Sequence, residues 1–231
     1  MSVPEAATRV FGDRTPLAVA YRDWLADAAV TRGLIGPRES GRLWERHILN
    51  CGVIGELFDR DARVVDIGSG AGLPGIPVAI ARPDLRLVLV EPLLRRTTFL
   101  SEVVADLGLE NVEVARGRAE EKGIVAEYGD ADAVTSRAVA PLDRLVRWSA
   151  PLIAAGGRLV AMKGSSAQAE IDEHRAACAR AGIAELSVTT VGGTVLPEPT
   201  TVVVGRKVAK RGDERRRARS SNRRDNTTQS H

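Results

Sequence analysis

The sequence predicts a doubly wound α/β fold: a mostly parallel seven-stranded sheet with an antiparallel C-terminal edge hairpin, preceded by N-terminal helices. Short apolar runs alternate with amphipathic stretches from residue 64 onward, and this rhythm is typical of parallel strands joined by helical crossovers. Only GGTVLPEP separates the last two apolar runs, which is too short for a crossover, so these two strands should pair antiparallel. With 231 residues, 44% of them hydrophobic, the chain can form one such core.

The residues before this alternation, 1–60, should form a helical segment. Apolar residues recur at three-and-four spacing over 17–30 and again over 38–58, which places them on one face of a helix. A Gly-Pro pair separates the two stretches. We expect both apolar faces to pack in the core, with Trp24 and Trp44 as core anchors rather than platforms for stacked bases.

Residues 61–208 should contain the sheet and its crossover helices. Gly, Pro or charged residues close each apolar run, and such residues separate strands from helices. Strands are expected at 64–67, 85–91, 112–117, 131–137, 158–164, 185–191 and 200–207. Helices are expected at 73–82, 93–108, 141–157 and 166–182.

The positive charge of the chain is concentrated at its C-terminus. From Arg206 onward there are ten Lys and Arg against three Asp and Glu, whereas the rest of the chain is slightly acidic. Residues 209–231 contain too little apolar surface to offset the entropy of ordering, so we expect a basic, disordered tail. The tail is either an arm that binds a polyanion or a solubilising terminus.

Several protein classes are excluded by what the sequence lacks. No apolar run reaches the length of a membrane span, and the N-terminus has no basic segment followed by an apolar one. Cys51 and Cys178 are isolated and belong to no His/Cys cluster, so we expect neither a disulfide framework nor a metal site. We expect a cytoplasmic protein.

The most informative segment is the glycine loop, Asp66-Ile-Gly-Ser-Gly-Ala-Gly-Leu-Pro-Gly75. It leaves the first strand and enters a helix, where backbone N–H groups and the positive helix end meet a ligand. Counted from Gly70, it matches the G-x-G-x-x-G fingerprint of nicotinamide dinucleotide enzymes. Counted from Gly68, which follows the strand directly, it resembles the first motif of class I S-adenosylmethionine-dependent methyltransferases.

Glu91 ends the second strand, 19 residues after Gly72. A carboxylate at this position can accept hydrogen bonds from both ribose hydroxyls of an adenosine ligand. Both cofactor classes contain such a ribose. Glu91 is therefore a candidate cofactor-binding residue that does not decide between them.

Further motifs narrow the choice. DIGSGAGLPGIPVAI, EPLLRRTTFL, RAEE, TSRAVAPL and AMKG follow one another between Leu43 and Lys207. In this order and spacing the chain resembles the bacterial small-subunit ribosomal RNA guanine-N7 methyltransferases of the glucose-inhibited division protein B type. The resemblance implies S-adenosyl-L-methionine as cofactor, a Rossmann-like domain over 61–208, and methylation of N7 of one guanine in 16S ribosomal RNA.

The resemblance also implies contacts for particular residues. Gly68 and Leu73 would line the cofactor, and Ala119 and Glu120 would flank its adenine. Arg137, at the end of the fourth strand, would close the site. Without the resemblance, the Ala119-Glu120 pair is better explained as the start of a helix with an acidic first turn.

Arg137 is also the candidate catalytic residue. Guanine N7 carries a lone pair and no proton, so its methylation needs no general base, and proximity, orientation and desolvation should dominate. The guanidinium can bind the cofactor carboxylate, an RNA phosphate or guanine O6. Alternatively, Arg137 is tied to Asp132 or Asp143 and only holds the loop. We expect Cys51 to lie away from the strand ends as a small buried residue.

The sequence predicts a partner and leaves alternative functions open. His47 is expected to satisfy a contact within the helices rather than to face the site. The expected partner is 16S ribosomal RNA, free or within the small subunit, bound by a monomer without metal or membrane. The alternatives are a methyltransferase for a small molecule or another RNA, a nicotinamide-dependent oxidoreductase, and a non-catalytic RNA chaperone. The basic residues expected to bind RNA, besides the tail, are Arg38, Arg42, Arg46, Arg95, Arg96, Arg137 and Lys163.

Deleting residues from Arg211 onward tests the role of the tail. The deletion removes seven Lys and Arg, which would release counterions on binding RNA. RNA affinity should fall and depend less steeply on salt, while cofactor affinity stays unchanged. Binding titrations at several salt concentrations measure this, and an unchanged salt slope would identify the tail as a solubilising terminus.

Overall fold

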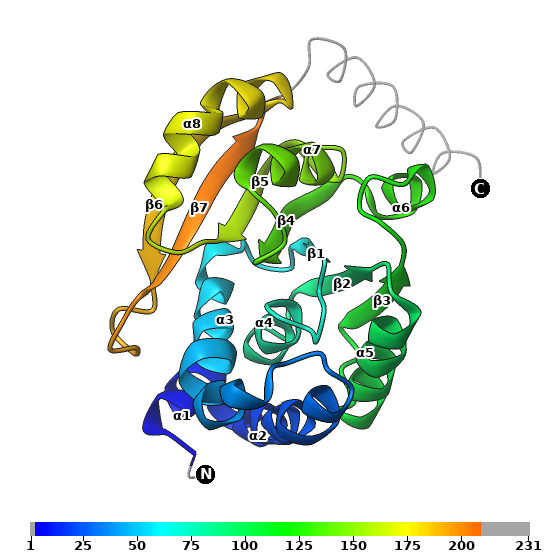
Figure 1. Ribbon diagram of the computed structural model, residues 1–231, viewed down its shortest axis with the longest axis vertical. Coiled ribbons are helices and arrows are strands. Elements are labelled where there is room, and N and C mark those ends of the chain that lie inside the picture. Colours follow the sequence, from blue (N-terminus) through cyan, green and yellow to red (C-terminus); the bar gives the residue numbers. More distant parts are fainter. Residues whose placement is uncertain (1–2, 209–231) are drawn as a thin grey trace, which may run out of the picture.

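A twisted seven-stranded sheet runs through the computed structural model, which describes residues 3–208 except for the side chains of Pro37, Arg38 and Ser40 (Figure 1). The strand order is β3-β2-β1-β4-β5-β7-β6. The strands are β1 (Arg63–Ile67), β2 (Arg86–Glu91), β3 (Val112–Arg116), β4 (Ala131–Arg137), β5 (Ile153–Met162), β6 (Ile183–Val191) and β7 (Thr200–Lys207).

The pairing confirms the predicted fold class. Each neighbouring pair among the first five strands is parallel, and β7 is antiparallel to both β5 and β6. The hairpin occupies one edge of the sheet as predicted, with its second strand inserted next to β5 and its first strand outermost. The short link between the two strands permits this, because an antiparallel return needs no crossover helix.

Helices cover both faces of the sheet. In Figure 1 the N-terminal helices, α4 and α5 lie on one side of the strands, and α6, α7 and α8 lie on the other. The central strands are buried on both faces, which explains why they are continuous apolar runs in the sequence. The helices after β1 are α4 (Gly75–Ala81), α5 (Leu94–Asp106), α6 (Lys122–Tyr128), α7 (Leu142–Ser149) and α8 (Ala167–Arg180).

The N-terminal segment packs into the same core as α4 and α5. The Tyr21 side chain is fully buried, and its hydroxyl donates a hydrogen bond to the carbonyl of Ala71 in the glycine loop at 2.8 Å. Trp24 packs edge-on against Phe99, and Trp44 is buried. The first elements are α1 (Glu5–Phe11), η1 (Gly12–Arg14), α2 (Thr15–Trp24), the π-helical turn η2 (Leu25–Ala29) and the 3-10 helix η3 (Pro37–Arg42).

The second predicted helix, 38–58, is irregular. It is divided into η3, the π-helical η4 (Trp44–Leu49), α3 (Asn50–Gly52) and the 3-10 turn η5 (Val53–Leu57). Its apolar face is nevertheless buried as predicted. A change in the number of residues per turn rotates the following side chains around the helix axis but does not expose the whole apolar stripe.

The predicted helix over 141–157 is wrong in its second half. Helix α7 ends at Ser149, and the chain enters β5 at Ile153, which pairs with Ala131. Pro151 lies between them and has no backbone N–H with which to continue the helical hydrogen bonds. The pairing of β4 and β5 also shifts register here, which a sequence pattern does not reveal.

Helix α6 follows the Ala119-Glu120 pair, which the sequence alone suggested as a helix start, but its extent was not predicted. Ile124 and Tyr128 lie four residues apart and are both buried against the sheet, so its apolar stripe is only two turns long. Such a short stripe is hard to recognise from periodicity. In the part of the chain that the structure describes, no helix is both long and apolar enough to cross a membrane.

Replacing Tyr21 by Phe tests how the N-terminal segment is attached. The change leaves the buried Ala71 carbonyl without the phenol donor, so the free energy of unfolding should fall by about 1–2 kcal/mol. Tyr128→Phe is the matched control, because the Tyr128 hydroxyl donates to the exposed carboxylate of Glu113 and its loss should cost less. Urea denaturation measures both, and equal losses would contradict the proposed attachment.

Candidate active site

The site forms where the strand order reverses, between β1 and β4. Ligands of open α/β sheets bind at such a point, outside the carboxyl ends of the strands. Here β1 leads into the glycine loop and β4 ends at Arg137. The register pairs Asp66 with Thr135, so these two segments leave neighbouring positions of the sheet.

The glycine loop exposes its backbone. Gly68 and Gly70 have φ angles of +67° and +58°, a region that favours glycine. At Gly70 an added Cβ would meet no atom nearer than the Gly68 carbonyl oxygen at 3.9 Å, so the space above it is open. At Gly68 an added Cβ would lie 2.9 Å from Val139, in the loop after β4.

Asp66 holds the two ends of this loop together from below. Its side chain is fully buried, and Oδ2 accepts a hydrogen bond from the N–H of Gly75, the first residue of α4, at 3.0 Å. Oδ1 has no hydrogen-bond partner. Burial raises the pKa of this carboxyl to about 7.

Glu91 lies beside the glycine loop, as predicted. Only 1% of the residue is exposed. One carboxylate oxygen accepts from the Gly70 N–H at 3.1 Å and lies 3.5 Å from an Arg96 nitrogen, and the other accepts from the Leu93 N–H at 3.1 Å. The carboxylate thus joins the end of β2 to the glycine loop.

The other three expected cofactor residues lie in two segments, the glycine loop and the turn after β3. Leu73 is partly buried against the core beneath the loop. Ala119 is buried and Glu120 is exposed, in the turn between β3 and α6. That turn is linked to Glu91, because the Gly117 N–H donates to the Glu91 carbonyl at 3.2 Å.

Arg137 contacts neither of the carboxylates suggested by the sequence. One terminal nitrogen donates to Nδ1 of His47 at 2.8 Å, and the other donates to the Cys51 sulfur at 3.4 Å. Asp132 accepts instead from a backbone N–H, and Asp143 pairs with an arginine in α7. Among the described residues, no carboxylate lies within ion-pair distance of Arg137.

The expectations for Cys51 and His47 are therefore corrected. Both lie against Arg137 at the end of β4, because η4 and α3 pack over this edge of the sheet. Their spacing of four residues, which places them on one helix face, was the available signal. Burial raises the pKa of the Cys51 thiol to about 11, so it is protonated and not a nucleophile at neutral pH.

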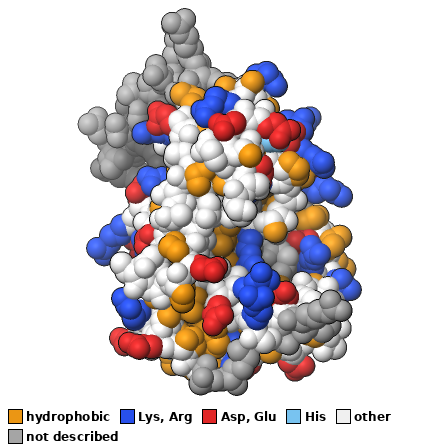
Figure 2. All heavy atoms as spheres, turned by 60° about the vertical axis from the view of Figure 1, so that its left-hand side comes forward, with side chains coloured by type: hydrophobic (Ala, Val, Ile, Leu, Met, Phe, Trp, Pro, Cys, Tyr) orange, Lys and Arg blue, Asp and Glu red, His pale blue; other side chains and the backbone are white. Residues whose placement is uncertain are grey.

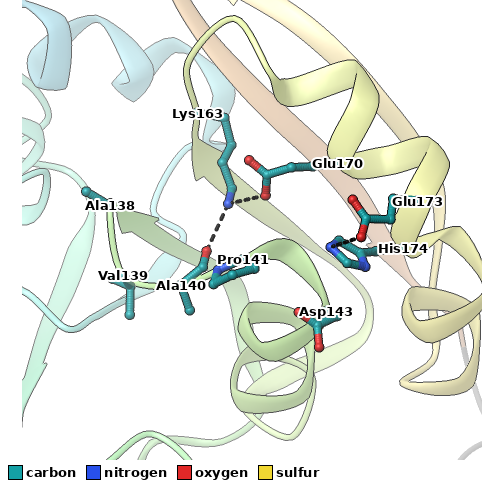
Figure 3. Close-up of a pocket in the computed structure, with 9 residues that line it drawn as sticks. All are labelled: Ala138, Val139, Ala140, Pro141, Asp143, Lys163, Glu170, Glu173 and His174. Carbon is teal, nitrogen blue, oxygen red and sulfur yellow. Dashed lines mark hydrogen bonds and ion pairs between the residues drawn. The ribbon is translucent and has the colours of Figure 1, made fainter.

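The loop after Arg137 is strained, and its residues 138–141 line a hollow together with Lys163 and Glu170. Ala138 has a φ of +53°, which costs of order 1 kcal/mol for a residue other than glycine. Figure 3 shows Lys163, at the end of β5, reaching toward Ala140 and Glu170. Its ammonium donates to the Ala140 carbonyl at 2.9 Å and to the Glu170 carboxylate at 2.7 Å, so Lys163 is already paired. Within the described chain no cluster of residues suits a metal ion.

Comparisons with known proteins identify the family of the chain. A family profile described as rRNA small subunit methyltransferase G matches residues 14–197. The chain belongs to this family. It is 57% identical over 212 residues to the ribosomal RNA small subunit methyltransferase G of Mycobacterium marinum, with 92% of each chain covered. It is 58% identical over 210 residues to that of Rhodococcus jostii, with 91% of this chain and 92% of the relative covered.

Solved structures show that the rRNA small subunit methyltransferase G fold is shared more widely. The S-adenosylmethionine-dependent methyltransferase SibL matches with a TM-score of 0.57 and 17% identity, over 87% of this chain and 74% of its own. A predicted O-methyltransferase from Agrobacterium tumefaciens matches with a TM-score of 0.55 and 20% identity, over 68% and 80%. These likenesses concern the fold alone. Membership of the family gives no support to the nicotinamide-dependent alternative.

Replacing Asp66 by Asn tests the burial of this carboxyl. Because its pKa is raised in the folded state, the stability it contributes is present below about pH 4 and is lost as the pH rises through about 7. The loss is at most about 4 kcal/mol. Asn is neutral throughout, so thermal stability of Asp66→Asn should depend less on pH between about 5 and 8.

The control for this measurement is Asp84→Asn. Arg82 holds the pKa of the Asp84 carboxyl well below its ordinary value, so its contribution to stability is lost only at lower pH. The control should keep the slope of the wild type over the same range. An unchanged slope in Asp66→Asn would show that Asp66 does not titrate there.

Proposed function

We propose that this protein is an S-adenosyl-L-methionine-dependent methyltransferase that methylates N7 of a guanine in 16S ribosomal RNA. The observation that carries the proposal is the juxtaposition at the switch point. An open glycine loop beside the Glu91 carboxylate lies next to Arg137, a cation that no carboxylate pairs with in the described chain. Family membership supports the RNA as substrate.

The residues of the site fit the proposed cofactor. The free space above Gly70 admits a ligand close to the backbone, and the buried Glu91 carboxylate can accept hydrogen bonds from ribose hydroxyls. Ala119 offers a small apolar side chain at the turn that is linked to Glu91. Gly68, Leu73, Glu91, Ala119, Glu120 and Arg137 would hold the cofactor.

The chemistry asks little of the protein beyond orientation. The cofactor, when bound, supplies an electrophilic methyl group on a sulfonium. Guanine N7 attacks through its lone pair without losing a proton, so the proposed reaction needs neither a nucleophile nor a general base from the protein. Cys51 stays protonated, and burial holds the pKa of Tyr21 well above its usual value. Excluding water and aligning the base are the remaining contributions.

Arg137 is the proposed catalytic residue. Two of its N–H groups are used by neutral acceptors, and its charge remains available for an anionic or carbonyl group. Suitable partners are the cofactor carboxylate, an RNA phosphate and guanine O6. A cation would repel the forming 7-methylguanine cation itself, so the guanidinium acts on one of these neighbouring groups.

RNA binding would depend on local cations. On the face shown in Figure 2, Lys and Arg side chains are interspersed with Asp and Glu. Arg42, Arg46 and Arg95 are exposed, whereas Lys163 is paired with Glu170. The Arg38 side chain and residues 209–231 lie outside the described part. We propose that the protein acts as a monomer in the cytoplasm. Its target guanine should lie in a looped region of the RNA, because a duplex hides N7 in its deep groove.

Replacing Gly68 by Val tests the binding loop. A valine would have a φ of +67° and would collide with Val139, so affinity for S-adenosylhomocysteine should fall at least about tenfold. Gly70→Ala is a gentler second variant, because its methyl enters the open space without a clash. Calorimetry measures both, with Gly123→Val, which has no neighbour within 4 Å, as the control. Normal affinity in both loop variants would contradict the assignment.

Replacing Arg137 by Ala tests its role in transfer. Single-turnover methyl transfer should fall at least about tenfold, equivalent to one charge-assisted contact of about 1.4 kcal/mol. Arg137→Lys should recover only part of the rate, because lysine lacks the planar fork. An unchanged rate with lowered thermal stability would show that Arg137 only supports the structure.

A further inference from the structure

We propose that His47, oriented by Glu39, is a positioning residue for Arg137 and holds it through a neutral imidazole. This rests on the proposed function. The residues come from η3, η4 and β4, and they form one chain of hydrogen bonds. His47 Nε2 lies 2.9 Å from a Glu39 oxygen, and His47 Nδ1 lies 2.8 Å from a terminal nitrogen of Arg137.

The chemistry of the partners determines the tautomer of His47. A guanidinium can only donate, so Nδ1 must accept with its lone pair. The ring proton is then on Nε2, where it is donated to the Glu39 carboxylate. This assignment uses both nitrogens of the ring, and it leaves no place for a second ring proton.

The electrostatics of the site agree with a neutral ring. Burial and the nearby Arg137 charge lower the pKa of His47, and Glu39 opposes this shift. The charged or titratable groups around His47 are Glu39 at Nε2, Arg137 at Nδ1 and Arg46 on the same helix. The Cys51 thiol lies on the far side of the Arg137 guanidinium. The thiol is protonated and carries no charge at neutral pH.

This arrangement holds Arg137 without neutralising it. A carboxylate in direct contact would fix the guanidinium but would also pair with its charge. The imidazole and the thiol fix two terminal nitrogens while the negative charge of Glu39 stays one ring away. The remaining N–H groups of Arg137 are left for an anionic or carbonyl group of the ligands.

Protonation of His47 would break its hydrogen bond with Arg137. An N–H at Nδ1 would point at the N–H of Arg137, and the two donors would repel. Methyl transfer should therefore fall as the pH decreases through the pKa of His47, which lies below its ordinary value. A variant that accepts at the same place but cannot be protonated should lack this acid limb.

Two variants with the same amide group, His47→Asn and His47→Gln, distinguish the contributions of the two ring nitrogens. In His47→Asn the side-chain oxygen can take the place of Nδ1 and accept from Arg137. In His47→Gln the amide reaches toward Glu39 but offers no acceptor at the position of Nδ1. Single-turnover transfer to 16S ribosomal RNA in small subunits should fall about tenfold in His47→Gln and stay within about threefold of wild type in His47→Asn.

Further comparisons separate positioning from a structural role. The transfer rate of His47→Asn should not fall at low pH as the rate of the wild type does. Combining His47→Gln with Arg137→Ala should slow transfer no more than Arg137→Ala alone, because both remove the same contact. Additive losses, or equal rates in His47→Gln and His47→Asn, would overturn the proposal while leaving the proposed function intact.

A measurement without substrate completes the test. An NMR titration of His47 in the full chain should show its pKa rising in Arg137→Ala, where a neighbouring cation is lost, and falling in Glu39→Gln, where the anion is lost. Unchanged titration in both variants would show that the contacts do not exist in solution. If the wild type transfers no methyl group to the RNA, the proposed function fails first, and the positioning role fails with it.

Discussion

The parallel pairing of β1 with β4 is the constraint on which the site depends. It places the carboxyl end of each strand at the same edge of the sheet, so the glycine loop and Arg137 emerge side by side although some 65 residues separate them in the sequence. The helices that follow, α4 and α7, lie on opposite faces. At the carboxyl ends of the two strands this topology leaves backbone N–H groups and side chains free for a ligand.

The N-terminal helices complete the site. Tyr21 donates to the glycine loop, and His47 and Cys51 reach Arg137. The segment shares a hydrophobic core with α4 and α5, so a disturbance of its packing would be transmitted to both halves of the site. A sheet with its crossover helices alone would leave Arg137 without these two acceptors.

The site contains three energetically unfavourable features that the core must offset. Asp66 is buried with one oxygen unpaired, Thr135 on the adjacent strand has an unpaired hydroxyl, and Ala138 has left-handed backbone. Each costs of order 1–3 kcal/mol. Apolar layers on both faces of the sheet surround them. A binding site can retain unsatisfied polar groups and backbone strain when the surrounding packing offsets their cost.

The sequence by itself determined the alternation of strands and helices, the edge hairpin, the glycine loop and the acidic end of β2. These follow from local periodicity and from residues that only particular backbone conformations accept, such as glycines at positive φ. Local patterns were insufficient where an element was short, as in α6, or where a proline divided a predicted helix, as at Pro151.

The partners of Arg137 were decided only by the tertiary structure. Sequence proximity suggested Asp132 or Asp143, yet the contacts come from His47 and Cys51, at separations of 90 and 86 residues. The directions in which the His47 and Cys51 side chains point depend on how an irregular run of π, α and 3-10 turns packs over the end of β4. Hydrogen bonds between such distant groups depend on the packing of whole elements, and periodicity along the chain carries no information about that packing.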